Sequence, residues 1–223
     1  MPVDSGSDVS QRIMRVAKQL FFAKGYVGTP LRTIANKAGT SESGVLRIFE
    51  SKSGLLRAVY ASCWAEINAR IDQALAAAEA DDPDPRNLLL RLMQTVFETY
   101  DADPPMMNFM LSYFGFNETT GLSQDEGVDP AIDSQVRQEY HRYLGRIHGL
   151  CDEAAKSRPT FARTGVTSAA LGHIFTSMIY GIQAGWYMAA QEPDTPTPQV
   201  TAKEALKAAE LFMYPEKWQG GRP

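Results

Sequence analysis

The chain of 223 residues is predicted to fold as an all-α protein. Apolar residues recur at intervals of three and four over most of its length, which is the period of a helix that buries one face. Ser and Thr residues stand directly before several of these stretches, where their side chains can cap the first turn. No stretch alternates apolar and polar residues as a half-buried strand would. The pattern therefore predicts about nine helices and no sheet.

Local signals mark where the first four predicted helices start or stop. The first ends at Gly25, a residue suited to helix termination. The second follows Thr29, a predicted N-cap, and closes at Gly39. Ser41 and Ser51 are predicted to cap the third helix and a long fourth helix. The first helix has an apolar face made of Ile13, Val16, Ala17, Leu20 and Phe21.

The rest of the chain continues in the helical pattern, with polar or proline-rich breaks. The apolar pattern of the fourth helix fades in the alanine-rich residues 74–80, and a turn is predicted at 81–85. Residues 117–130 are predicted to form an exposed loop. Residues 191–199 contain three prolines and are predicted to be a linker. The further predicted helices cover 86–101, 106–116, 132–156, 161–190 and 201–213.

Residues 29–52 combine two short helices, a tight turn and the capped start of another helix. Ile34 and Ala35 lie on the inner face of the first short helix, and Ala35 is small where the second helix must cross. Val45 and Phe49 supply the inner face of the second. This order is typical of a helix-turn-helix DNA reader. The simpler alternative is a plain helical hairpin with a solvated polar face.

The second short helix is predicted to point five residues outward or toward its own start. Arg47 is the candidate for a specific base contact, because a guanidinium can donate two hydrogen bonds to guanine. A phosphate contact by the same side chain is the alternative. The five residues are Glu42, Ser43, Gly44, Leu46 and Arg47.

Charge is divided unevenly along the chain. The net charge of the whole chain is −4, which alone argues against a nucleic-acid partner. Residues 1–57, however, hold nine Lys or Arg and four Asp or Glu, a net of +5, whereas the remainder has a net of −9. A basic N-terminal unit on an acidic body is what a DNA reader with a separate control domain requires.

Residues 12–57 resemble the N-terminal domain of the tetracycline-repressor (TetR) family of transcriptional regulators. The resemblance covers about a quarter of the chain, and the remainder agrees only in length and helical character. It implies a DNA-binding domain over residues 1–52 and a larger ligand-binding and dimerisation domain over 53–223. The matching residues are Arg12, Ile13, Ala17, Leu20, Phe21, Gly25, Tyr26, Thr29, Ile34, Ala35, Ala38, Gly39, Ser41, Phe49, Ser51, Lys52, Leu55 and Leu56.

The resemblance also assigns roles within the DNA-binding domain. By position, Thr29 and Lys52 look like contacts to backbone phosphates. The family commonly has Tyr where this chain has Leu46, which cannot donate to a phosphate but could touch a thymine methyl. Gly44 stands where the family often has Thr or Ser, and close backbone approach to DNA is one explanation for it. The full predicted DNA-binding set is Thr29, Arg32, Glu42, Ser43, Gly44, Leu46, Arg47 and Lys52.

The segment 106–116 is apolar almost all round, as expected of a buried helix. Core packing is the simpler explanation. The alternative is a mostly apolar pocket for a small-molecule effector. The residues predicted to line such a pocket are Trp64, Phe97, Met106, Phe109, Met110, Tyr113, Met178, Ile182 and Trp186.

Small residues recur along the helix predicted at 161–190, where they would let another helix approach closely. The resemblance implies that 161–190 and 201–213 form a homodimer interface of four helices. The alternative is that these glycines fit neighbours within one chain. A two-fold symmetric reader matches a palindromic operator in double-stranded DNA. The predicted function is therefore a homodimeric transcriptional repressor, released from its operator by a small apolar or amphipathic effector.

Three alternatives to this function remain open. The first is an activator, or a ligand-independent DNA binder of the same fold. The second is a helical enzyme that uses His173, Tyr180 or Glu153, although nothing in the sequence links them into a nucleophile and base. The third is a structural nucleoid protein indifferent to DNA sequence. We predict no enzymatic activity, cofactor or metal site.

Cysteine usage and hydropathy bound the location. Cys63 and Cys151 are far apart and have no metal or redox spacing. The N-terminus lacks the basic and apolar segments of a signal peptide. No apolar run has the length that spans a bilayer. We therefore expect a cytoplasmic protein that does not bind membranes.

Overall fold

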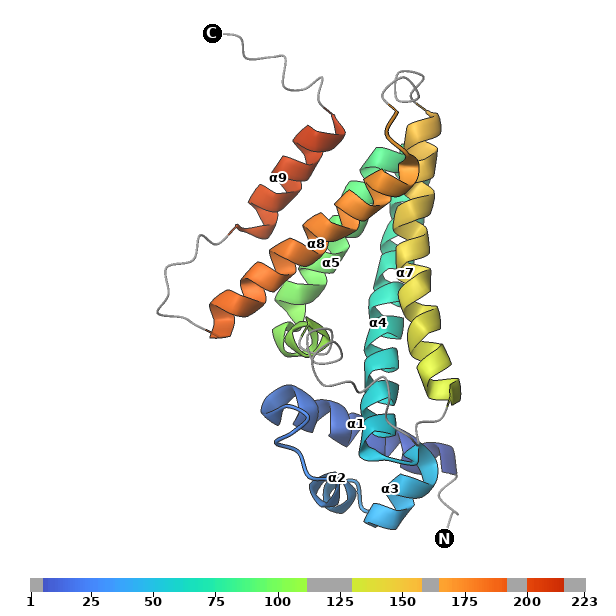
Figure 1. Cartoon of the computed structure of the whole chain (residues 1–223), viewed down its shortest axis with the longest axis vertical. Coiled ribbons are helices and arrows are strands. Elements are labelled where there is room, and N and C mark those ends of the chain that lie inside the picture. The colour runs from blue at the N-terminus through green and yellow to red at the C-terminus, as the bar shows by residue number, and fades with distance from the viewer. Residues whose placement is uncertain (1–5, 112–129, 158–164, 192–199, 215–223) are drawn as a thin grey trace. The chain divides into compact units, whose positions relative to one another are not determined.

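A computed structural model describes residues 6–111, 130–157, 165–191 and 200–214. Within these ranges every regular element is a helix (Figure 1), so the predicted all-α fold is confirmed. The helices divide into two compact units. The first comprises Met1–Glu66 and Asp103–Tyr140, and the second comprises Ile67–Ala102 and His141–Pro223.

Two helices contribute residues to both units. These are α4 (Lys52–Asp81) and α7 (Pro130–Lys156). The predicted domain boundary at residue 52 coincides with the first residue of α4, and it stays a prediction. The apolar pattern fades along residues 74–80, yet α4 continues to Asp81, because alanine has the highest intrinsic helix propensity.

The first unit contains a bundle of three short helices. They are α1 (Gly6–Lys24), α2 (Leu31–Lys37) and α3 (Glu42–Phe49), and each contacts the other two. The side chains with no exposed surface at the centre of this unit include Ile13, Ala17, Ile34 and Val45. They are the apolar positions that the helical spacing predicted, so burial of one face of each helix holds the bundle together.

Predicted caps and stops in this bundle are confirmed at four places. The Ser41 hydroxyl accepts a hydrogen bond from the Gly44 N–H at 3.1 Å, and the Ser51 hydroxyl accepts one from the Gly54 N–H at 2.8 Å. Gly25 and Gly39 have φ of 69° and 68° and directly follow or closely follow the ends of α1 and α2. Glycine adopts this left-handed conformation without the steric penalty of a side chain.

The predicted N-cap role of Thr29 is wrong. Pro30 occupies the N-cap position of α2, and no side chain caps that helix. The Thr29 side chain is 1% exposed, and its hydroxyl donates to the carbonyl of Gly25 at 2.8 Å. The hydroxyl thus satisfies a carbonyl at the end of α1 instead of an N–H at the start of α2.

Residues 104–111 form a further helix, and they belong to the first unit. Asp103 begins it, since its carboxylate accepts a hydrogen bond from the Met106 N–H at 3.0 Å. Within this helix Phe109 is 7% exposed, and its ring lies parallel to that of Phe21 on α1 with 6.3 Å between centroids. The rest of the predicted helix 106–116 and the predicted loop 117–130 lie largely outside the described residues.

The second unit is built on α5 (Pro85–Ala102), which packs against α8 (Ser168–Gln191) and α9 (Ala202–Met213). Most of the surface of α5 is buried, including Leu89, Leu92 and Met93, none of which has exposed surface. The same unit contains an ion-pair cluster in which Arg142 and Arg146 of α7 both contact Asp72 of α4. These contacts join α7 to α4 within the second unit.

One predicted helix boundary needs correction. The helix predicted at 161–190 begins only at Ser168, and residues 165–167 are not helical. Gly165 has a φ of 72°, and the Thr167 hydroxyl accepts a hydrogen bond from the Ala170 N–H at 3.1 Å. Thr167 is therefore the N-cap of α8. Most of the predicted linker 191–199 lies outside the described residues.

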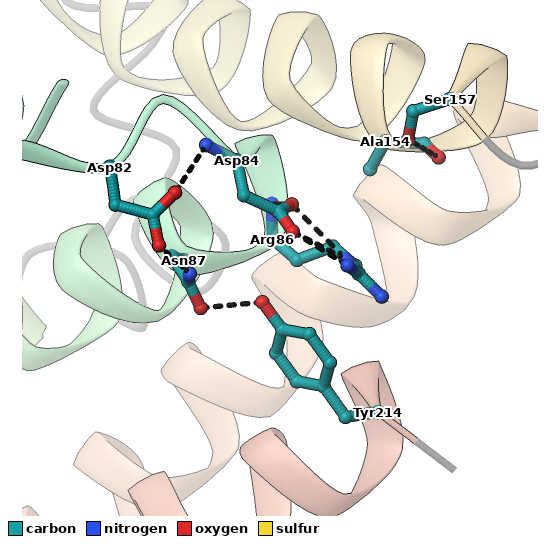
Figure 2. Close-up of polar contacts among 7 residues, drawn as sticks. All are labelled: Asp82, Asp84, Arg86, Asn87, Ala154, Ser157 and Tyr214. Carbon is teal, nitrogen blue, oxygen red and sulfur yellow. Dashed lines mark hydrogen bonds and ion pairs between the residues drawn. The ribbon is translucent and has the colours of Figure 1, made fainter. Parts of the chain in front are cut away.

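A polar network ties the end of α9 to the start of α5 (Figure 2). The Tyr214 hydroxyl donates to the Asn87 side-chain carbonyl, and the Asn87 amide donates to Asp82. The Arg86 guanidinium pairs with Asp84 at 2.6 Å and lies 4.1 Å from the centroid of the Tyr214 ring. This network fixes where α9 ends on the surface of α5.

Replacing Asp84 by Asn tests the charge in this network. The hydrogen bonds from Arg86 hold the pKa of Asp84 below its usual range, so the charged carboxylate stabilises the folded state. This contribution is present above the unfolded pKa and is lost as the pH falls through the lower folded pKa. We expect Asp84→Asn to lower the free energy of unfolding by about 1 kcal/mol at pH 7. Chemical denaturation should show that the difference shrinks below about pH 4.

Asp84 also caps the start of α5, since its carboxylate accepts a hydrogen bond from the Arg86 N–H at 2.9 Å. An Asn side chain can accept the same bond, so the substitution leaves the start of α5 intact and isolates the ion pair. An equal loss of stability at pH 7 and pH 3 would contradict the electrostatic explanation.

Both cysteines are buried. Burial raises the pKa of the Cys63 thiol to about 12 and that of the Cys151 thiol to about 11, so neither is a reactive thiolate near neutral pH. Over the ranges that the structure describes, no helix is both long and apolar enough to cross a bilayer.

Candidate nucleic-acid interface

Five of the eight predicted DNA-binding residues lie on α3, and four of the five are exposed. The Ser41 cap fixes the first turn, and Val45 and Phe49 anchor the opposite face in the core with exposures of 0% and 5%. Glu42, Ser43 and Arg47 are therefore exposed. Leu46 is exposed to 39%, which leaves it available for an apolar contact with a base.

Gly44 has a local explanation. A Cβ atom at this position would lie 2.5 Å from the Thr40 hydroxyl oxygen and 3.3 Å from the Ser41 hydroxyl oxygen. The Gly44 N–H is also the group that Ser41 caps. A side chain here would press on the N-cap itself, so the turn between α2 and α3 is sufficient reason for glycine, whether or not DNA approaches it closely.

Lys52 is committed to a neighbour within the protein. Its Nζ donates to the Tyr26 carbonyl at 2.7 Å and lies 4.2 Å from the centroid of the Tyr26 ring. Burial lowers the pKa of Lys52. The lysine thus joins the turn after α1 to the first residue of α4, and a phosphate contact by the same ammonium stays a prediction.

The other two predicted contacts differ in accessibility. Arg32 lies on α2 and is exposed, so it can reach a phosphate. Thr29 is buried, and its hydroxyl is used by the carbonyls of Gly25 and Leu20. A phosphate contact by the Thr29 side chain stays a prediction, and it would require this hydroxyl to exchange partners.

The predicted effector-binding residues fall into both units. Trp64, Met106, Phe109 and Met110 belong to the first unit, and Phe97, Met178, Ile182 and Trp186 belong to the second. Tyr113 lies outside the described residues. A single pocket that combines the two groups stays a prediction.

The members in the first unit take part in an aromatic cluster that includes α1. Phe109 lies between Phe22, with 5.2 Å between ring centroids, and Tyr60, with 6.3 Å. Tyr60 in turn meets the edge of Trp64. The sequence did not single out Phe21 or Phe22 as functional residues, although they connect the apolar segment 104–111 directly to the DNA-reading bundle.

In the second unit, Trp186 of α8 is the centre of a smaller aromatic cluster. Its ring centroid lies 5.0 Å from those of Phe97 and Tyr100 on α5. Its indole N–H donates to the carbonyl of Val200 at 2.6 Å. Met178 and Ile182 lie on the same helix and are partly exposed.

An open groove of about 470 Å³ runs between α5 and α9, away from the predicted effector residues. Leu90 and Leu206 are its apolar members, and Arg91, Lys203 and Lys207 are among its charged ones. None belongs to the predicted effector set. Its mostly polar and charged lining is typical of the solvent-exposed edge where two helices pack together.

The residues considered for other chemistry are dispersed. Glu153 lies on α7, whereas His173 and Tyr180 lie on α8, and all three are exposed. Within the described residues, no group of three or more His, Cys, Asp or Glu side chains is placed to hold a metal ion.

Comparison with known proteins agrees with the geometry of α1 to α3. Residues 13–59 match the family of bacterial regulatory proteins described as the tetR family. Over 50 residues the chain is 42% identical to the uncharacterized HTH-type transcriptional regulator YvkB of Bacillus subtilis. This match spans 22% of the chain and 26% of the length of that relative.

Solved structures extend the likeness to the whole fold. FadR from Bacillus subtilis, in complex with stearoyl-CoA, has a TM-score of 0.64 at 15% identity, with 91% of this chain and 97% of that one covered. AibR, in complex with isovaleryl coenzyme A and operator DNA, has a TM-score of 0.59 at 14% identity, with 93% and 98% covered.

The helix-turn-helix bundle, the matched N-terminal segment and the shared fold define the class. Residues 13–59 carry the N-terminal domain of the tetR family of bacterial regulatory proteins, and the described part of the chain shares the fold of solved regulators of that family. The match to a family of regulatory proteins agrees with the expectation that the chain is not an enzyme.

Proposed function

We propose that this chain is a homodimeric transcriptional repressor that binds a palindromic operator and is released from it by a small amphipathic effector. The exposed face of α3, within the segment that matches the family, carries the proposal. It offers a guanidinium on Arg47 and an exposed apolar side chain on Leu46, the two kinds of group that read base edges in the major groove.

The charge distribution supports the same assignment. The net charge of +5 in residues 1–57 attracts DNA phosphates. The net negative charge of the chain is carried by the residues after 57. Arg32 and Arg47 are both exposed on the short helices α2 and α3. The affinity for DNA should therefore fall as salt concentration rises.

The homodimer proposal rests on α8. Ile174, Gly181 and Met188 follow one another at intervals of seven residues on one face of the helix, and all are exposed. Ile174 is 44% and Met188 55% exposed. A Cβ added at Gly181 or Gly185 would have no described atom within 4 Å, so neighbours in the same chain do not require these glycines. A second copy of the chain that packs closely against this face would require small residues at these positions.

Gly172 differs from the other two glycines. A Cβ at this position would lie 2.6 Å from Nδ1 of His148 on α7. This glycine is explained by packing inside the second unit. The small residues of α8 therefore serve two purposes: Gly172 fits an intramolecular neighbour, and Gly181 and Gly185 remain for the partner. On α9, Phe212 is also exposed, to 48%.

Gly181→Leu tests the interface. Leucine has a higher helix propensity than glycine, which costs roughly 0.8–1 kcal/mol relative to alanine in a helix, and the space at Gly181 within the chain is open, so the folded monomer should not be destabilised. The added side chain should hold the two copies of α8 apart and weaken the dimer at least about tenfold. Sedimentation equilibrium of the purified protein measures this dissociation constant.

Gly145→Leu is the matched control, because Gly145 is also an exposed helical glycine with open space, but it lies on α7. We expect this variant to remain as dimeric as the wild type. Equal dimer affinity in both variants would place the interface elsewhere.

The effector class is proposed from the aromatic clusters and the ligand-bound neighbours. Phe97, Tyr100 and Trp186 form an apolar surface in the second unit, and Phe109 and Trp64 belong to another in the first. FadR and AibR were each solved with an acyl thioester of coenzyme A. Together they support an effector with an apolar acyl portion and a polar head.

Phe109 supports a route by which an effector would reach the DNA-reading bundle. Its helix packs on Phe21 and Phe22 of α1, so a displacement of residues 104–111 presses on that helix. α4 offers a second route, since it begins at Lys52 beside the reader and continues into the second unit. The effector shifts the equilibrium only by its differential affinity for the bound and released states.

Selection of bound sequences from a random DNA pool, at a stated salt concentration, tests the proposed function. We expect a palindrome whose half-sites are centred about one helical turn, or a multiple of it, apart. Binding to that palindrome is then measured with and without stearoyl-CoA and isovaleryl-CoA, and release by one of them supports the effector class. Salt-sensitive binding with no enriched sequence would remove the specific-regulator assignment.

A further inference from the structure

Gln183 on α8 is a polar side chain in an otherwise apolar row. Phe175, Ile179, Gln183 and Trp186 follow at intervals of four, four and three residues, and so lie on one face of the helix. Phe175 and Ile179 are 2% and 1% exposed, and Gln183 is 6% exposed. This face of α8 is therefore directed toward the interior of the second unit, and the Gln183 amide is buried together with the apolar side chains.

The Nε2 group of Gln183 is buried, and among the described residues it has no hydrogen-bond partner. An amide N–H₂ left in this state costs about 1–3 kcal/mol relative to one that is satisfied. Buried polar groups in folded proteins are nearly always bonded, so an exception calls for an explanation in terms of function, water or an ion. A cation is excluded as the partner of Nε2, because both are positive at the point of contact.

The surroundings of Gln183 specify the chemistry of a partner. One turn further along α8, Trp186 packs on Phe97 and Tyr100 of α5, which supplies aromatic surface on the same face. A molecule that suits both features has an apolar body and an oxygen that accepts a hydrogen bond. A ketone, ester, thioester or carboxyl group satisfies the requirement, whereas an amine head group, which is a donor only when protonated, does not.

We propose that Gln183 is an internal hydrogen-bond donor for the effector, and that it selects molecules with a carbonyl-type oxygen at the end of an apolar body. The inference rests on the proposed function, because it presupposes that the second unit takes an effector. It adds the atom that recognises the polar end of that effector and the reason why the chain retains a buried amide there.

The proposal predicts a trade between stability and recognition at one position. Gln183→Met keeps the length and most of the volume of the side chain and removes the unsatisfied amide. The effector-free variant should therefore be more stable than the wild type, with an equilibrium constant for folding raised about fivefold to tenfold. If the fold needed Gln183 for its own packing, the substitution would instead lower the stability of the effector-free protein.

Recognition is tested with two probes that differ in one atom group. Octan-2-one carries a ketone oxygen, and 2-methyloct-1-ene has a CH₂ group in its place. Calorimetric titration of the full-length wild type should show about tenfold tighter binding of the ketone, the value of one hydrogen bond to a buried donor. Gln183→Met should bind both probes with equal affinity.

Gln94→Met is the matched control. Gln94 lies on α5 in the same unit, and its amide is already satisfied by the Glu98 carboxylate at 2.7 Å. This variant should keep the wild-type preference for the ketone. Nitrogen-15 NMR of the side-chain amides adds a direct reading, because the Gln183 resonance should shift with the ketone and not with the alkene.

The outcomes separate this inference from the proposed function. If Gln183→Met destabilises the effector-free protein, or if the wild type does not prefer the ketone, including binding neither probe, the inference is overturned. Operator binding by the same samples is an independent readout: intact sequence-specific binding with no ketone preference removes only the role of Gln183. Absence of sequence-specific binding in the wild type removes the proposed function.

Discussion

Arg47→Ala should relax the DNA sequence that the protein selects at one symmetric pair of positions. Arg47 is exposed on α3, directly after the exposed Leu46, and the helix is held by the Ser41 cap and the buried Val45. A guanidinium that donates two hydrogen bonds to guanine contributes about 1–3 kcal/mol of discrimination at that base pair. The variant should bind the wild-type operator roughly tenfold to a hundredfold more weakly.

Selection from a random pool, with the two proteins side by side at the same salt concentration, measures this effect. Lys37→Ala is the control, because Lys37 is another exposed cation of the bundle, at the end of α2 and outside the predicted reading set. It should leave the selected sequence unchanged. A uniform loss of affinity by Arg47→Ala, with a smaller dependence on salt and an unchanged sequence, would reassign Arg47 to a phosphate.

Phe109→Ala should give the largest loss of stability among the substitutions considered. Phe109 is 7% exposed and is surrounded by Phe21, Phe22 and Tyr60. Removing a buried phenyl ring costs about 3–5 kcal/mol in lost burial and in the cavity that remains. Urea denaturation followed by circular dichroism should therefore show an earlier transition, and operator binding should weaken because α1 loses its support.

Phe109→Leu separates packing from coupling. Leucine keeps most of the apolar volume but lacks the ring that stacks on Phe21, so the loss of stability should be no more than about 1.5 kcal/mol. If residues 104–111 transmit the effector signal, this variant should bind the operator normally and respond less to the effector. An unchanged response in a stable Phe109→Leu protein would assign transmission to another route, such as α4.

The local elements of this fold could be read from the sequence because their causes are local. Ser41 and Ser51 cap the helices that follow them, and Gly25 and Gly39 close the helices before them, because each of these effects involves residues only a few positions apart. The late start of α8 was missed, although Thr167 has the same capping chemistry as Ser41.

The hydrogen-bond partners of two predicted site residues could not be read from the helical pattern. Thr29 was expected at a helix start, but its hydroxyl satisfies carbonyls at Gly25 and Leu20. Lys52 was expected to contact a phosphate; its ammonium also donates to the Tyr26 carbonyl, and the phosphate contact stays a prediction. Periodicity indicates which face of a helix is buried, but it does not indicate which acceptor a side-chain donor reaches in the folded chain.

The candidate effector site shows the same division. Helical spacing identified the apolar side chains, and the structure placed some of them in the first unit and the others in the second. The helical period predicts which face of a helix is buried, but it does not predict which other helix covers that face. A polar residue on a buried face is visible in the sequence, and Gln183 between Ile179 and Trp186 could have been noticed on that basis.

By itself, the sequence determined the all-α class, the helix-turn-helix segment and its basic charge, because these depend on helical period, capping and composition. Only the tertiary structure decided that residues 104–111 pack on α1 through Phe109, that Gly172 fits His148 whereas Gly181 faces open space, and that the Gln183 amide is buried. Each of these depends on which surfaces meet, and contacts between distant segments are set by the packing of the whole unit.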